Sequence, residues 1–79
     1  MNEFLNNMDR LHTTFLGEER IRRNLKIPNK DVVLYLKNKI MNERFSLSVK
    51  GKNYYCVVDN ICITINRFTY TIITALILK

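Results

Sequence analysis

The second half of the chain alternates between apolar and polar residues with the two-residue period of a β-strand. The alternation is regular over residues 45–49 and 61–65, and residues 54–58 and 70–78 are rich in β-branched and aromatic side chains. Gly, Asn and Asp residues between these segments favour tight turns. The pattern predicts a four-stranded antiparallel meander over residues 45–79.

The three predicted turns together define one register for this sheet. The first two turns set Cys56 between Leu47 and Ile63, and the last turn sets Ile65 opposite Tyr70. A slip of one residue would turn every side chain to the other face. The predicted apolar face consists of Phe45, Leu47, Val49, Tyr54, Cys56, Val58, Ile61, Ile63, Ile65, Tyr70 and Ile72. The other face is mostly polar, so we expect it to face water or a partner.

The two cysteines fall on opposite faces in this register. Because the side chains of Cys56 and Cys62 then point apart, we expect no disulfide between them. Two cysteines without a second pair of ligands also predict no zinc site. The sequence therefore predicts free thiols and no bound metal.

The first half of the chain has apolar residues at helical spacing. Residues 2–15 are predicted to form an amphipathic helix that ends at Gly17, and residues 18–25 a second, short helix. Residues 30–42 are predicted to form a third helix, which Asn29 would cap.

These elements predict an α+β fold, with about three N-terminal helices followed by the meander. We expect a single domain over residues 1–79, with a helical part at 1–44 and the sheet at 45–79. The first and third helices are expected to cover the apolar face, and the second to be a connector.

The charge is unevenly distributed along the chain. The formal net charge is +6, from 13 Lys and Arg against seven Asp and Glu. Residues 1–25 are neutral, whereas residues 26–52 hold seven basic and two acidic residues. A basic segment of this kind is typical of a surface for nucleic acid or an acidic protein, and also of a solvated helix face.

The chain offers few groups for catalysis. His12 is its only histidine, and it suits either a half-buried helix position or a general acid and base. Arg20, Arg22 and Arg23 could together hold a phosphate. We find no Gly-rich phosphate loop, nucleophile elbow, paired carboxylates or metal-ligand spacing, so we expect no cofactor.

The termini favour a cytoplasmic protein. Residues 1–10 lack a basic run leading into an apolar segment. The apolar stretch 70–78 is far shorter than the ~20 residues that a membrane-spanning helix needs. We expect the cytoplasm, which would be that of the host cell if a phage encodes the protein.

Several blocks resemble a family of small bacterial and phage proteins known only as a domain of unknown function. They are HTTxxGxxRIxxNL at residues 12–25, GKNYY at 51–55, ITIN at 63–66 and YTIITA at 70–75. Members of that family often carry His directly after the last block, where this chain has Leu76. Such a histidine would be the natural partner of His12 in an acid/base pair.

The small size, the basic segment 26–52 and the missing catalytic pair, together with the phage association that the resemblance implies, favour a small basic, non-enzymatic protein that binds RNA or a nucleoprotein and inhibits it. An anti-CRISPR-like inhibitor is one concrete form. The residues expected to contact the RNA or the partner are Lys37, Lys39, Lys50, Lys52, Tyr55, Thr64, Thr71, Arg20, Arg22 and Arg23.

Two other functions remain open. The order of helices and strands is similar to the metal-independent RNase fold of barnase-like and colicin-like toxins. That likeness implies His12 as the base, Arg20 and Lys52 as phosphate ligands and Thr71 as an orienting hydroxyl, although Leu76 in place of His counts against activity. The third function is a homodimer through the last strand, because an apolar strand at a sheet edge invites strand addition.

Overall fold

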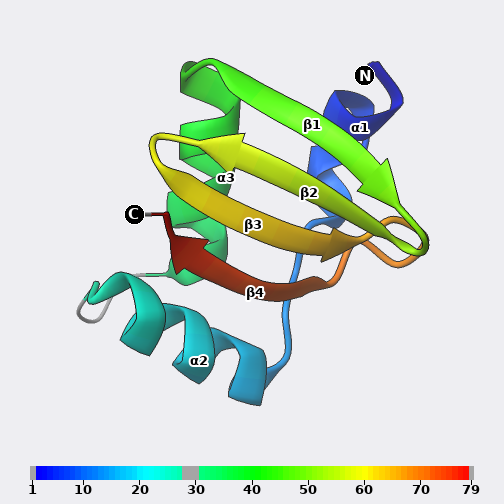
Figure 1. The fold of residues 1–79 in the computed structure, drawn as a ribbon. Coiled ribbons are helices and arrows are strands. Elements are labelled where there is room, and N and C mark those ends of the chain that lie inside the picture. The colour runs from blue at the N-terminus through cyan, green and yellow to red at the C-terminus, as the bar shows by residue number, and fades with distance from the viewer. Residues whose placement is uncertain (1, 28–30, 79) are drawn as a thin grey trace.

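The computed structural model describes residues 2–27 and 31–78 and has helical segments followed by one antiparallel sheet (Figure 1). The helical elements are α1 (Asn2–Asn6), a 3₁₀ helix η1 (Met8–Arg10), α2 (Phe15–Leu25) and α3 (Val32–Asn42). The strands are β1 (Phe45–Lys50), β2 (Asn53–Val58), β3 (Ile61–Asn66) and β4 (Ile72–Ile77). They lie in the order β1-β2-β3-β4. The predicted α+β architecture is confirmed.

The first two hairpins have the predicted register. Cys56 pairs with Leu47 on one side and with Ile63 on the other. The β2–β3 turn consists of Asp59 and Asn60, whose φ angles of 48° and 63° are those of a tight turn between twisted strands. The residue types at the turn and the two-residue period thus determine the same pairing.

The register predicted for the third hairpin is wrong. Ile65 pairs with Ile72 rather than with Tyr70, and the register shifts between Thr64 and Ile65. The turn is longer than predicted because the side-chain oxygen of Asn66 accepts hydrogen bonds from the backbone of residues 68 and 69, at 2.9 and 3.0 Å. β4 therefore begins two residues later and carries an extra residue, Ile73, which forms a bulge.

The predicted helix over residues 2–15 is also wrong in its second half. The chain leaves the helical conformation after Arg10, and residues 11–14 run alongside β4. His12 N donates to Tyr70 O at 3.1 Å, and Ile72 N donates to His12 O at 2.7 Å. The physical reason is the N-cap of α2. Thr14 accepts a hydrogen bond from Gly17 N, and a capping residue needs an extended backbone.

Gly17 is not a helix C-cap but lies buried in the first turn of α2. This helix packs along β4 (Figure 1), so it is more than the predicted connector. Asn24 fastens it further along, because its amide donates to Ala75 O at 3.3 Å. A Cβ at residue 17 would collide with the hydroxyl of Thr13, which is itself bonded to Ile72 O. Glycine is therefore required by the close approach of α2 to the 11–14 segment.

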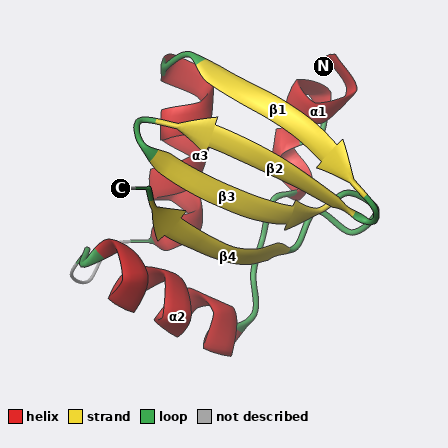
Figure 2. Ribbon diagram, in the orientation of Figure 1, coloured by secondary structure: helices red, strands yellow, loops and turns green. Residues whose placement is uncertain are grey.

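One face of the sheet is covered by α1 and α3, and the other is left open (Figure 2). α3 is capped by Asp31, whose carboxylate accepts from Leu34 N, while the predicted cap Asn29 lies outside the described residues. The ring of Phe4 on α1 packs against Tyr54 and Tyr70. No helix within residues 2–27 and 31–78 is long and apolar enough to cross a membrane.

Most of the predicted apolar face is buried, but the apolar side chains of the edge strand β1 are poorly covered. Val49 on β1 is 53% exposed, and Phe45 and Leu47 are only partly buried. The buried core consists of Phe4, Met8, Leu11, Ile21, Leu25, Val32, Leu36, Ile40, Tyr54, Cys56, Val58, Ile61, Ile63, Ile65, Tyr70, Ile72 and Ala75. Both cysteines are free thiols, with Cys56 in the core and Cys62 on the other face.

Two core side chains carry ionisable groups. Burial raises the pKa of the Cys56 thiol from its ordinary 9.0 to about 12. Burial, followed by a hydrogen bond with the hydroxyl of Tyr54, raises the pKa of Tyr70 from 10.0 to about 12. Both groups therefore stay neutral in the folded protein at a pH where the unfolded chain loses their protons.

We expect Gly17→Ala to lower the free energy of unfolding by about 1–2 kcal/mol, because the new methyl group displaces the stiff Thr13 side chain and its hydrogen bond. In an unobstructed helix interior the same change would stabilise by ~1 kcal/mol. Urea unfolding measures the difference. Glu19→Ala, an exposed change on the same helix, is the matched control. A Gly17→Ala variant more stable than the control would contradict the close approach.

We also expect the free energy of unfolding to fall as the pH rises from about 9 towards 12. The unfolded chain releases protons that the folded chain retains, so each titrating group contributes a loss of about 1.4 kcal/mol per pH unit. Urea unfolding at several alkaline pH values tests this expectation. In Cys56→Ala the decline in stability should begin nearer pH 10, where the unfolded chain begins to lose the proton of Tyr70. An unchanged onset in that variant would be inconsistent with a buried neutral thiol.

Candidate functional site

His12 and Thr71 are joined by a hydrogen bond where the 11–14 segment meets the start of β4. His12 Nδ1 lies 2.8 Å from the backbone oxygen of Arg10, and His12 Nε2 lies 3.1 Å from Thr71 Oγ1. A carbonyl oxygen only accepts, so the Nδ1 of a neutral ring carries the proton. Nε2 is then the acceptor, and the hydroxyl of Thr71 donates to it.

A second hydroxyl extends this cluster. Thr69 Oγ1 lies 2.7 Å from Thr71 Oγ1 and also accepts from Thr71 N at 3.3 Å. Because the proton of Thr71 points to His12, the proton of Thr69 points to Thr71. The three side chains thus form an ordered chain of hydrogen bonds that ends at the carbonyl of Arg10.

A shallow hollow of about 280 Å³ lies beside Thr71, between α2 and β4. Leu16, Gly17 and Arg20 line it from α2, and Thr71 and Ile73 line it from the strand side. The hollow exists because the α2 side carries no side chain at residue 17 and because the bulge turns Ile73 outward.

The structure therefore brings together part of the set predicted for an RNase. His12 and Thr71 are bonded to each other, and Arg20 lines the same hollow as Thr71. Lys52 does not line it, since it lies in the β1–β2 turn, where its carbonyl accepts from Arg67 N at 2.9 Å. A histidine at the position of Leu76 would not reach His12. Leu76 lies five residues beyond Thr71, and at ~3.3 Å per residue this places it roughly 16 Å from the residue that His12 contacts.

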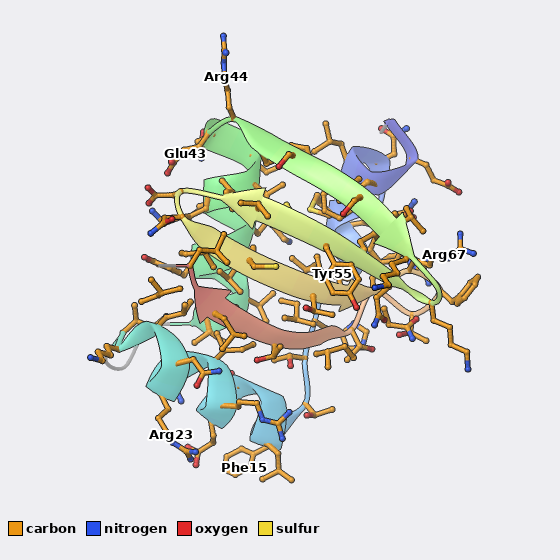
Figure 3. The ribbon with its side chains drawn as sticks, in the orientation of Figure 1. Phe15, Arg23, Glu43, Arg44, Tyr55 and Arg67 are labelled. Atoms are coloured by element: carbon orange, nitrogen blue, oxygen red, sulfur yellow. The ribbon has the colours of Figure 1, made fainter. Side chains whose placement is uncertain are left out.

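The open face of the sheet is a second candidate surface. The register places the following residues on it: Ser46, Ser48, Lys50, Asn53, Tyr55, Val57, Cys62, Thr64, Asn66, Thr74 and Leu76. None of them is acidic. Tyr55 is half-buried, lies near the middle of the sheet beside Thr64 and projects from this face (Figure 3).

The lysines of α3 lie on the other side of the sheet. Lys39 Nζ pairs with Asp59 and lies 3.5 Å from Glu43. The hydrogen bond that Lys39 donates to Asp59 raises the pKa of Lys39 above its ordinary value. Lys37 is on the same helix. Lys37 and Lys39 therefore lie on the opposite side of the sheet from the other predicted contacts, Lys50, Tyr55 and Thr64.

The arginines of α2 also differ in their surroundings. Arg22 forms an ion pair with Glu18 at 3.1 Å. Arg23 is exposed and points away from the sheet (Figure 3). Of the three, Arg20 alone lines the hollow.

Sequence reasoning missed Arg67 and Thr69. Arg67 lies in the turn after β3, donates from Nε to Gly51 O at 3.1 Å and sits next to Lys52. The sequence predicts this turn, but the turn lies outside the basic segment 26–52. The positive charge of Arg67 is therefore not counted with that segment. Within residues 2–27 and 31–78, no group of three or more His, Cys, Asp and Glu is placed to hold a metal ion.

Comparison with known proteins identifies the family but no activity. The family described as "Protein of unknown function (DUF3781)" matches residues 5–76, which is nearly the whole chain. No curated protein and no solved structure matches significantly. The likeness to barnase-like and colicin-like RNases accordingly gains no support. The resemblance seen in the sequence blocks is confirmed, and the chain belongs to the DUF3781 family.

Proposed function

We propose that the protein binds single-stranded RNA on the open face of its sheet, without cleaving it. The observation that supports this most directly is the composition of that face. It has an aromatic side chain near its middle, many hydroxyl and amide groups, a lysine and no acidic residue. Four-stranded sheets with one exposed face and an aromatic platform suit unstacked bases.

The charges around the face support the same proposal. Lys50 is on the face, and Lys52 and Arg67 meet at the adjoining end of the sheet, where the two turns are hydrogen-bonded to each other. The acidic residues Glu43 and Asp59 are instead paired with Lys39. A phosphate backbone crossing the sheet would therefore meet positive charge at one end and no repulsion along the way.

Tyr55 would be the stacking side chain. It lies on a central strand, with β1 on one side and β3 on the other, so a base on its ring would be flanked by Ser48 and Thr64. Stacking of this kind tolerates any base, because every base has a π-face. The proposal thus implies weak sequence preference and strong salt dependence. Inhibition of a nucleoprotein, as in an anti-CRISPR-like protein, would be a consequence of holding its RNA.

Removing Lys50 or Lys52 is expected to weaken the salt dependence of RNA binding. Each of Lys50→Gln and Lys52→Gln should reduce the slope of log K against log salt by about 0.7, the value for one phosphate contact on a single strand. Fluorescence anisotropy with labelled single-stranded RNA in EDTA measures the slope. Lys37→Gln removes the same charge from α3 and should leave it unchanged. If the wild-type protein does not bind RNA even at low salt, the proposal is wrong.

Replacing Tyr55 tests stacking separately from charge. Tyr55→Ala should cost about 1–3 kcal/mol of binding free energy without changing the salt slope, whereas Tyr55→Phe should bind like the wild type. The same titration measures both, and circular dichroism confirms the fold. Equal affinity of the Ala and Phe variants would place the RNA elsewhere on the protein.

A further inference from the structure

We propose that Thr71 is a nucleophile that accepts an acyl group from an activated ester, with His12 as its general base. The inference rests on the hydrogen-bonded order carbonyl, imidazole and hydroxyl. Arg10 O accepts from His12 Nδ1 at 2.8 Å, and His12 Nε2 accepts from Thr71 Oγ1 at 3.1 Å. A nucleophile, a base within hydrogen-bond reach and a third group that orients the base form the general pattern of an activated hydroxyl.

The backbone holds this pair in place. His12 is hydrogen-bonded to the residues on either side of Thr71, through Tyr70 O at 3.1 Å and Ile72 N at 2.7 Å, so the imidazole and Thr71 lie on adjacent, paired segments. Arg10 connects both ends of the arrangement. Its carbonyl orients the ring, and its guanidinium donates to Phe68 O at 2.8 Å in the turn that carries Thr69.

The oxygen of Thr71 keeps a lone pair for attack. Its proton points to His12, and one lone pair accepts the hydroxyl proton of Thr69 at 2.7 Å. The remaining lone pair is not used by either bond. Thr71 lines the hollow between α2 and β4, so an electrophile seated there would lie beside this residue.

The lining of the hollow indicates the class of acyl donor. Leu16 and Ile73 form apolar walls, and Arg20 supplies a positive charge. The hollow is shallow and has a volume of about 280 Å³, so it suits a small acyl group. The arrangement therefore fits a short-chain ester whose carbonyl oxygen or leaving group becomes negative, and the guanidinium would stabilise that charge.

The chemical step is an ordinary acyl transfer. Thr71 Oγ1 forms a bond to the carbonyl carbon while its proton passes to His12 Nε2. The tetrahedral adduct then collapses, the bond to the leaving oxygen breaks, and that oxygen departs with the electron pair and takes a proton from His12 or from water. The products are an ester on Thr71 and the free alcohol or phenol, so no oxidant, reductant or metal is needed.

The test uses the full-length protein and p-nitrophenyl acetate. We expect release of p-nitrophenolate and one acetyl group on Thr71, located by tandem mass spectrometry. Hydroxylamine removes an ester but leaves the amides formed on lysines, so it separates this product from non-specific acetylation. Thr71→Ser should still be labelled, Thr71→Val should not, and His12→Asn should lower the rate at least about 100-fold, the usual contribution of a general base.

A control variant and a fold measurement separate chemistry from structure. Tyr35→Phe removes a hydroxyl from α3, on the other side of the sheet, and should leave labelling unchanged. Thermal unfolding should show that His12→Asn and Thr71→Val remain folded, since the bonds to β4 are made by the backbone. The proposal is overturned if the hydroxylamine-sensitive acetyl is absent from Thr71, or if folded His12→Asn is labelled as fast as the wild type.

Discussion

The bridge between His12 and Thr71, which holds the 11–14 segment beside the start of β4, is the interaction on which the placement of α2 and the candidate site depends. Backbone groups at the edge of a sheet need partners, and here the two hydrogen bonds of His12 provide them at Tyr70 and Ile72. The same short segment ends η1, places Thr14 to cap α2 and thereby sets that helix along β4. The predicted dimer through the last strand needs free backbone groups at this edge of the sheet, and His12 already bonds those of Tyr70 and Ile72. The oligomeric state itself remains a prediction.

The parts of the fold that could be predicted from the sequence are those where two local signals agree. The first two hairpins combine regular alternation with short turns, and their pairing at Cys56 is as predicted. The third hairpin could not be predicted, because the side chain of Asn66 lengthens the turn and a bulge absorbs the extra residue. The spacing of Leu11 and Phe15 fits a helix, yet Phe15 is 74% exposed and begins a new helix instead.

The candidate site was predicted only in part, for a different reason. His12 and Thr71 are separated by 59 residues, and their contact depends on the non-local pairing of two extended segments. Residue types suggested both as candidates, but no period or spacing in the sequence indicates that the imidazole and the hydroxyl meet. The basic segment 26–52 was in turn misleading as a unit, because folding places Lys39 and Lys50 on opposite sides of the sheet.

The bulge at Ile73 determines how this family can change in length. Beyond it, Thr74 pairs with Thr64 and Ala75 with Ile63, whereas before it Ile72 pairs with Ile65. Removing Ile73 would restore a regular ladder with every other side chain on its present face, at the expense of one wall of the hollow. Loss of Ile72 or Thr74 would let Ile73 take the vacated place, and the residues beyond would keep their present faces. A deletion further along β4 would instead exchange the faces of the residues between the bulge and the deleted position. Single deletions should therefore be tolerated only at the bulge and directly beside it, and a homologue that lacks Ile73 would keep the fold while losing one wall of the hollow.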